Sequence, residues 1–251
     1  MNSIVKLVYR WNRGSLATPD FFCTPFVVTA EEVLYNAVKY GYLYNWFTVD
    51  DARNIANTGW SVPTKQSFID LRIYLDVAGT DNINIAGGKL KETGLTYWLN
   101  PNTGATNEVG FNARGTGSRA VDGTFFWLNK TCIFFTTESL DLDNAFSTEL
   151  REDSDTFNTN NVTYYKNGGT TIRFIKDTTS LTHGQTGTYT GNDGKVYRTI
   201  CIGTQEWLAD NLVETLYRDL SAIPEVTDNA TWAGLSTGAR CSYDNDENNA
   251  I

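Results

Sequence analysis

Residues 110–138 constrain the fold of this chain more than any other stretch. They read GFNARGTGSRAVDGTFFWLNKTCIFFTTE, with an Asp122-Gly123 pair between two extended segments. Glycine adopts positive φ freely and aspartate tolerates it, so this pair predicts a β-hairpin. Because adjacent residues on a strand point to opposite faces, we expect only one of Phe126 and Trp127 to face outward. We choose Trp127, because its indole N–H favours an accessible partner.

Composition narrows the class of protein. A chain of 251 residues is long enough for one large domain or two small ones, each with a sizeable core. Aromatic residues make up 13% of it, and 21 glycines accompany a single methionine, which indicates many short strands and turns. The formal charge of −9 excludes a nucleic-acid partner, because phosphate binding depends on clustered Lys and Arg.

Neither targeting nor metal-binding patterns are evident. The first residues contain no apolar run of signal-peptide length, and no later run approaches the roughly 20 apolar residues of a membrane span. We therefore expect a soluble chain that does not insert into a membrane and, unless a leader was trimmed, is not exported. The four cysteines (Cys23, Cys132, Cys201 and Cys241) form no C-x-x-C pair, so free buried thiols are favoured over a zinc or redox site.

The N-terminal part divides into an attachment segment and the start of a domain. We expect residues 1–28 to form two short strands joined by a loop and to serve attachment or subunit contacts. Residues 29–251 are expected to form the main domain. Thr29 and Glu32 have the spacing of a capping box, which predicts a helix toward Tyr40. The clearest helix begins at Thr64, with Phe68, Leu71 and Leu75 as one buried stripe and Gly79 as its stop.

Strand signals dominate the second half of the chain. Residues 145–150, 161–166 and 170–176 alternate in polarity and predict strands. Residues 178–188 are polar, include the only histidine, His183, and are interpreted as a linker. A hairpin over Asp193-Gly194, a strand through residues 196–201 and a short helix over residues 206–212 follow. The sequence thus predicts an α+β fold.

Several long motifs resemble a known family. They are YGYLYNWFTVDDARNIANTGWSVPT, AGGKLKETGLTYWLNPNTGATNEVGF, the Arg119 to Gly123 hairpin, FFTTE at residues 134–138 and IRFIKD at residues 172–177. These motifs resemble the Fibrobacter succinogenes major paralogous domain, which occurs in Bacteroidetes surface proteins and their phages. The resemblance implies a C-type-lectin-like, formylglycine-generating-enzyme-like domain with small twisted antiparallel sheets, few helices and long loops.

The order of the motifs departs from the family pattern. The part similar to the family's C-terminal part spans residues 40–177, and the part similar to its N-terminal part, residues 189–251, comes last. This order implies a circular permutation in which residues 178–188 join the family's ends, since a linker of this length spans up to about 40 Å. The alternative is a domain swap, in which residues 189–251 complete the fold of a neighbouring subunit.

Relatives of this fold include the variable proteins of diversity-generating retroelements, which display hypermutated side chains on a lectin-like domain. The resemblance implies that the stretch 110–138 interleaves scaffold and display residues. The implied scaffold is Gly110, Phe111, Gly117, Arg119, Gly123, Phe125, Leu128, Phe134 and Glu138. The implied ligand-binding residues are Ser118, Ala120, Val121, Phe126, Trp127, Lys130, Thr131 and Cys132. The alternative is an irregular aromatic hairpin that packs on its neighbours.

Catalysis is not expected, and neither is a cofactor. Formylglycine-generating oxidases of this fold use a close pair of cysteines, which this chain lacks, and histidine chemistry has only His183 to use. The spacing of Asp244, Asp246 and Asn248 suits oxygen ligands of calcium. It lacks the glycine and the distal glutamate of an EF-hand loop, so a flexible acidic tail is favoured.

Two kinds of function remain after these exclusions. The first is a receptor-binding adhesin, at a phage tail or fibre tip on the virion or at a bacterial cell surface, that recognises a host cell-surface protein or glycan. The second is a structural or assembly protein of the same fold. By analogy with phage receptor-binding proteins, we expect a homo-oligomer, a trimer in particular, or contacts with other virion tail proteins.

Overall fold

The computed structural model describes residues 7–11, 23–27 and 38–251, in two compact units, Met1–Ala37 and Val38–Ile251. In the first unit, β1 (Leu7–Trp11) pairs antiparallel with β2 (Cys23–Val27). The two predicted N-terminal strands are confirmed. The helix predicted to start at Thr29 falls mostly outside the described residues. The first unit ends at Ala37 in the chain, whereas the expected boundary is at residue 28.

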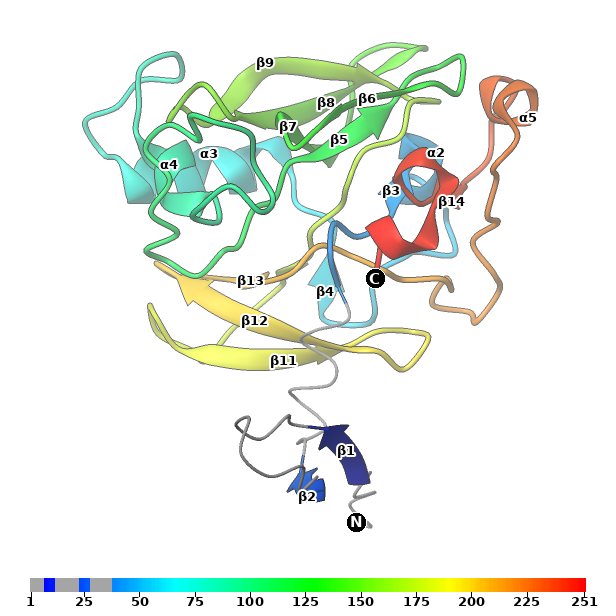
Figure 1. Cartoon of the computed structure of the whole chain (residues 1–251). Coiled ribbons are helices and arrows are strands. Elements are labelled where there is room, and N and C mark those ends of the chain that lie inside the picture. Colours follow the sequence, from blue (N-terminus) through cyan, green and yellow to red (C-terminus); the bar gives the residue numbers. More distant parts are fainter. Residues whose placement is uncertain (1–6, 12–22, 28–37) are drawn as a thin grey trace. The chain divides into compact units, whose positions relative to one another are not determined.

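The second unit is a mixed α+β structure of small antiparallel sheets (Figure 1). A five-stranded sheet has the order β11-β12-β13-β10-β4, and a three-stranded sheet has the order β7-β8-β9. The strands are β3 (Leu43–Tyr44), β4 (Trp60–Ser61), β7 (Thr131–Ser139), β8 (Asn144–Arg151), β9 (Asn158–Tyr165), β10 (Ile175–Lys176), β11 (Thr186–Thr190), β12 (Val196–Ile202), β13 (Gln205–Leu208) and β14 (Arg240–Cys241). The helices are α2 (Trp46–Val49), α3 (Lys65–Leu75), α4 (Ala86–Leu90) and α5 (Asn229–Ala233), with 3₁₀ turns η1 (Tyr243–Asn245) and η2 (Glu247–Asn249).

The predicted helix is α3. The Thr64 side chain accepts a hydrogen bond from the Ser67 backbone N–H at 3.1 Å and caps its start. Phe68, Leu71 and Leu75 are buried along one face, as predicted. The helix ends at Leu75, so the predicted stop at Gly79 is wrong.

The buried face of α3 joins the two larger sheets. The Phe68 ring lies 5.8 Å from the Phe134 ring of β7 and 5.0 Å from the Trp207 ring of β13. All three side chains are fully buried within one hydrophobic cluster. This aromatic centre makes α3 the layer between the sheets, as its place in Figure 1 indicates.

Residues 189–251 lie in the same compact unit as residues 40–177. Trp207 of β13 pairs with Ile175 of β10, between the two segments. At the open ends, the N–H of Lys39 donates to Ala250 O and that of Tyr40 donates to Asn249 O, both at 3.0 Å. The start and the end of this unit are therefore adjacent.

Three sequence predictions in this half are corrected. Residues 206–212 form no helix, because Gln205–Leu208 is β13, paired with both β12 and β10. The expected linker 178–188 includes the start of β11. Within 170–176, only Ile175–Lys176 is a strand, whereas Thr170 and Thr171 form single bridges. The hairpin over Asp193-Gly194 is confirmed, and Gly194 has a φ of 81°.

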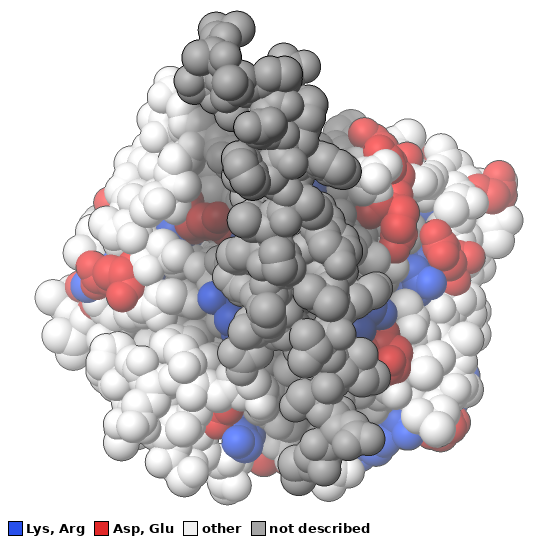
Figure 2. Space-filling model, turned by 60° about the horizontal axis from the view of Figure 1, so that its bottom comes forward, with Lys and Arg blue, Asp and Glu red and all other residues white. Residues whose placement is uncertain are grey.

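Surface charge is mixed. On the face that Figure 2 shows, the coloured Lys and Arg side chains are scattered among Asp and Glu side chains and form no continuous basic patch. Within the ranges that the structure describes, no helix combines the length and the apolar character needed to cross a membrane.

Candidate functional site

The predicted hairpin over Asp122-Gly123 is present. β5 (Thr116–Arg119) pairs with β6 (Phe125–Leu128), and Ser118 lies opposite Phe126. The turn is closed by the Ala120 N–H, which donates to Thr124 O at 2.8 Å, and Gly123 has a φ of 86°. The Asp122 carboxylate accepts from the Thr124 hydroxyl and N–H, and these bonds hold the pKa of Asp122 below its usual value.

Two neighbouring rings of β6 face solvent together. Phe126 is 45% exposed and Trp127 is 50% exposed, whereas Phe125 and Leu128 on either side pack against the buried cluster that contains Tyr243. The Phe126 and Trp127 rings lie 6.0 Å apart. The prediction that only one of them faces outward is wrong, because Trp127 has a φ of 66° and the strand alternation ends there.

The backbone of Trp127 is held in the left-handed region, which is rare for a bulky residue and costs roughly 1–2 kcal/mol. The Lys130 N–H donates to Trp127 O at 2.9 Å, and the Asn129 N–H donates to Gly115 O at 2.7 Å. Asn129 itself has a φ of 61° and accepts a hydrogen bond from the Tyr40 hydroxyl at 2.6 Å. Backbone strain of this kind clusters at functional sites.

Arg119 fastens the inner side of the hairpin to the rest of the unit. Its guanidinium is buried and donates to Gly123 O at 2.9 Å, Val226 O at 2.6 Å and Thr227 O at 3.0 Å. It also lies 4.3 Å from the centre of the Trp232 ring. A buried cation whose three nitrogens all donate hydrogen bonds therefore ties the turn to residues 226–229.

Gly117 provides a second point of support, because β5 passes very close to its neighbours there. A Cβ at Gly117 would lie 2.5 Å from Phe126 O and 2.6 Å from the Tyr243 ring, and its φ of 62° favours glycine as well. The Tyr164 hydroxyl donates to the Ser118 hydroxyl oxygen at 2.9 Å. β5 is thus packed closely against β6, Tyr243 and Tyr164.

The eight predicted binding residues divide by exposure. Phe126, Trp127 and Lys130 are exposed, Ala120 and Val121 are half-buried, and Ser118, Thr131 and Cys132 are buried. Burial raises the pKa of the Cys132 thiol to about 12, so it is protonated at neutral pH. Ser118 is buried beside the Tyr164 hydroxyl that donates to it, and Thr131 and Cys132 belong to the buried start of β7. The surface that a ligand reaches is therefore formed by the other five, which we call the hairpin surface.

Sequence reasoning missed one neighbour of the hairpin surface. Leu99 is 43% exposed, and its N–H donates to Asn129 O at 2.7 Å, next to the Trp127 bend. Leu99 lies almost 30 residues before Trp127 in the chain, in a loop without strand periodicity. Only tertiary structure brings the two segments together, so no sequence signal identifies Leu99.

The other sequence candidates have local structural contacts. Asp246 accepts hydrogen bonds from the Asn248 backbone and side-chain N–H groups. His183 Nδ1 accepts from the Gly203 N–H at 3.3 Å. In the part of the chain that the structure describes, no group of three His, Cys, Asp or Glu side chains is placed to bind a metal ion. The three cysteines whose side chains are described are buried free thiols, as predicted.

Comparison with known proteins identifies the family. The sequence model described as the Fibrobacter succinogenes major domain matches residues 23–176, which is more than half of the chain. The matched range includes the hairpin surface, α3, the whole three-stranded sheet, and β4 and β10 of the five-stranded sheet. Comparisons with curated proteins and with solved structures found no match. The chain belongs to the Fibrobacter succinogenes major domain family.

Proposed function

We propose that this protein is a ligand-binding adhesin and that the hairpin surface is its recognition site. The observation that carries the proposal is the joint exposure of Phe126 and Trp127, produced by a left-handed Trp127 backbone. The left-handed backbone turns the large Trp127 ring toward water. Hydrophobic burial therefore does not explain why this strained conformation is kept. A binding partner that covers both rings supplies that reason.

The composition of the hairpin surface suits recognition. Aromatic side chains bury a large area while few rotatable bonds are frozen, and tryptophan is frequent among binding hot spots. Lys130, whose N–H donates to Trp127 O, adds an exposed cation to the hairpin surface, and half-buried Ala120 and Val121 add small apolar side chains. The hairpin is held in place by the contacts of Arg119 and Gly117. The exposed side chains can therefore vary with little loss of folding stability. This arrangement supports a display role like that of diversity-generating-retroelement variable proteins.

We extend the proposal to the fold class of the second unit and to the location of the protein. We assign the second unit to the C-type-lectin-like folds, supported by its small antiparallel sheets, short helices and long loops. The proposed location is a phage tail or fibre tip on the virion, where the ligand is a protein or glycan on a Bacteroidetes host cell. A bacterial cell-surface adhesin is the alternative location, and a structural or assembly role is the alternative function.

Binding to intact cells tests the adhesin role. Fluorescently labelled protein is added to a panel of Bacteroidetes strains, and bound fluorescence is measured with and without excess unlabelled protein. We expect saturable, competed binding to at least one strain. Uncompeted or absent binding across the panel contradicts the adhesin role and favours the structural or assembly role.

We also propose that the protein assembles as a trimer, by analogy with phage receptor-binding proteins. Multivalent presentation of a weak site raises avidity without new contacts. Multi-angle light scattering at micromolar concentration is expected to give about three times the chain mass of 28.0 kDa. A mass close to that of one chain contradicts the proposal.

Circular permutation within one chain is proposed as well, supported by the hydrogen bonds of Lys39 and Tyr40 to residues 249–250. A re-permuted chain, with residues 184–251 joined by a short Gly-Ser linker to residues 38–183, restores the family's order. We expect it to unfold cooperatively within a few degrees of a control of residues 38–251 in their natural order, because its new junction lies where the ends already meet. Failure to fold, while the control in natural order folds, contradicts the permutation.

A further inference from the structure

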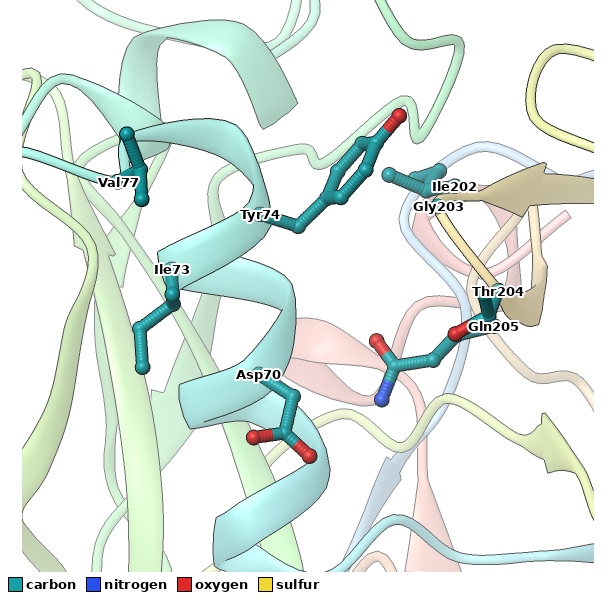
Figure 3. Close-up of a pocket in the computed structure, with 8 residues that line it drawn as sticks. All are labelled: Asp70, Ile73, Tyr74, Val77, Ile202, Gly203, Thr204 and Gln205. Carbon is teal, nitrogen blue, oxygen red and sulfur yellow. The ribbon is translucent and has the colours of Figure 1, made fainter.

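A groove lies on the outer face of α3, and it shares no residue with the hairpin surface. It is open, with a volume of about 570 Å³, between α3 and the β12–β13 turn (Figure 3). Small-molecule sites in proteins commonly span about 300–1,000 Å³. Its lining residues are Asp70, Ile73, Tyr74, Val77, Ile202, Gly203, Thr204 and Gln205.

Tyr74 supplies the groove with a fixed aromatic platform. It belongs to α3 but lies outside the buried stripe of that helix, and it is 50% exposed. Its ring lies against Gly203, where a Cβ would come within 2.9 Å of ring carbon Cδ2, and Gly203 has a φ of 64°. The His183 ring lies 5.3 Å away and accepts the Gly203 N–H. These contacts support the ring from the β12–β13 side and leave half of its area accessible.

Hydrogen-bonding groups flank the platform. The Gln205 amide projects from the turn toward α3, and its Nε2 donates to Ser67 O at 3.1 Å, which leaves the amide oxygen as an acceptor (Figure 3). Asp70, one turn before Tyr74, is exposed and accepts from Gln66 Nε2 at 2.8 Å. A carboxylate has about four acceptor positions, so Asp70 retains capacity for further donors.

Apolar side chains complete the lining. Ile73, next to Tyr74 on α3, is 42% exposed, and Val77, in the turn after the end of α3, is 84% exposed. The groove offers an exposed aromatic ring, apolar side chains at its edge and hydrogen-bond acceptors beside the ring. These features suit a ligand that has apolar ring faces and many hydroxyl donors around its rim. A pyranose has this character, because its C–H groups pack on the negative face of an aromatic ring while its hydroxyl groups donate.

We propose that this groove is a saccharide-binding subsite, separate from the hairpin surface. A pyranose ring stacks on Tyr74, its hydroxyls donate to Asp70 and to the Gln205 amide oxygen, and Ile73 and Val77 cover its edge. The groove is open at its ends, so it accepts one unit within a longer glycan chain. A cationic side chain is the competing ligand, because it pairs with Asp70 and lies over an aromatic face.

A glycan array tests the subsite. The purified full chain is applied to immobilised oligosaccharides of bacterial and plant origin, with oligolysine on the same array, and the strongest-binding sugar is then titrated in solution. We expect Tyr74→Ala to weaken sugar binding at least tenfold, Asp70→Asn to weaken it several-fold, and Tyr74→Phe to retain it. Tyr165→Ala is the matched control, because Tyr165 is 53% exposed on β9, and it is expected to bind as the unaltered chain does.

Thermal unfolding of each variant accompanies the titration, and melting temperatures within a few degrees of the unaltered chain establish that the loss is local. Three results overturn the proposal: no sugar on the array binds, Tyr74→Ala binds sugar unchanged, or only oligolysine binds in a Tyr74-dependent way. Trp127→Ala is expected to leave sugar binding at Tyr74 unchanged. If Trp127→Ala removes sugar binding while Tyr74→Ala does not, the sugar site is on the hairpin surface and the groove proposal is wrong.

Discussion

Replacing Arg173 by Met is expected to lower the free energy of unfolding by about 3–5 kcal/mol, because four acceptors, in three buried hydrogen bonds and one partly buried one, lose their donor. The Arg173 guanidinium is fully buried and donates to Asn211 Oδ1, Phe111 O, Leu208 O and Asn112 O, at 2.7 to 3.1 Å. Burial lowers the pKa of Arg173 to about 10, so the side chain remains charged at neutral pH.

The expected loss of stability is large because Arg173 connects segments of the chain through its hydrogen bonds. Its partners lie in two parts that are distant in sequence, the loop before β5 and the segment from the end of β13 to Asn211. A methionine fills similar volume but donates no hydrogen bond, so each carbonyl stays desolvated and unpaired. Arg173→Lys is expected to lose an intermediate amount, because a single ammonium lacks the planar fork that reaches all four acceptors.

Urea unfolding of the whole chain measures the loss. Arg151→Met is the matched control, because the Arg151 side chain is 46% exposed and pairs with Asp153 at 3.2 Å. An exposed ion pair contributes about 0–1 kcal/mol, so this control is expected to unfold close to the unaltered chain. Equal losses in the two variants contradict the role that we give to Arg173.

Local signals in the sequence predicted the elements that depend on local chemistry. Glycine after aspartate marked both hairpin turns, and Gly123 and Gly194 have the positive φ that such turns need. The Thr64 cap and the Phe68 stripe marked α3. In each case the deciding contacts join residues within four positions of one another in the chain, so a short window of sequence contains them.

Elements that depend on distant partners were predicted less well. Residues 206–208 have no strong local preference, and they become β13 because β10 and β12 flank them. Arg173 falls between Ile172 and Phe174 in an alternating segment, where a strand pattern predicts an exposed side chain. It is buried instead, because the 111–112 loop and β13 supply acceptors that no local window contains.

The candidate site was predicted in the same uneven way. The resemblance to a family indicated the stretch that contains the hairpin surface, but not which residues of that stretch are exposed. Strand alternation predicted one outward ring, and the left-handed backbone of Trp127 presents two. That bend is held by Gly115 and Lys130 through backbone hydrogen bonds, which side-chain patterns do not encode.

Replacing Trp127 by Ala is expected to weaken ligand binding by about 2 kcal/mol, roughly a 30-fold rise in Kd, if the indole is a hot spot. The same change is expected to leave the free energy of unfolding within about 0.5 kcal/mol of the unaltered chain, as for most surface positions. Half of the Trp127 side chain faces solvent, and alanine at this position keeps the backbone hydrogen bonds to its neighbours.

The exposed Tyr165 on β9 offers a control of similar exposure on a separate strand. Tyr165→Ala is expected to leave both stability and cell binding unchanged. Phe126→Ala is expected to weaken binding as well, because the two rings lie side by side and share one face. A loss confined to the two β6 variants assigns the binding to the hairpin surface.

The most direct test of the central claim is cell adsorption and thermal unfolding of Trp127→Ala, measured together on the same preparation. We predict an unchanged melting temperature and a loss of adsorption of about 30-fold. A large fall in melting temperature would mean that Trp127 is a core residue. Unchanged stability with unchanged adsorption would place the binding surface elsewhere on the protein.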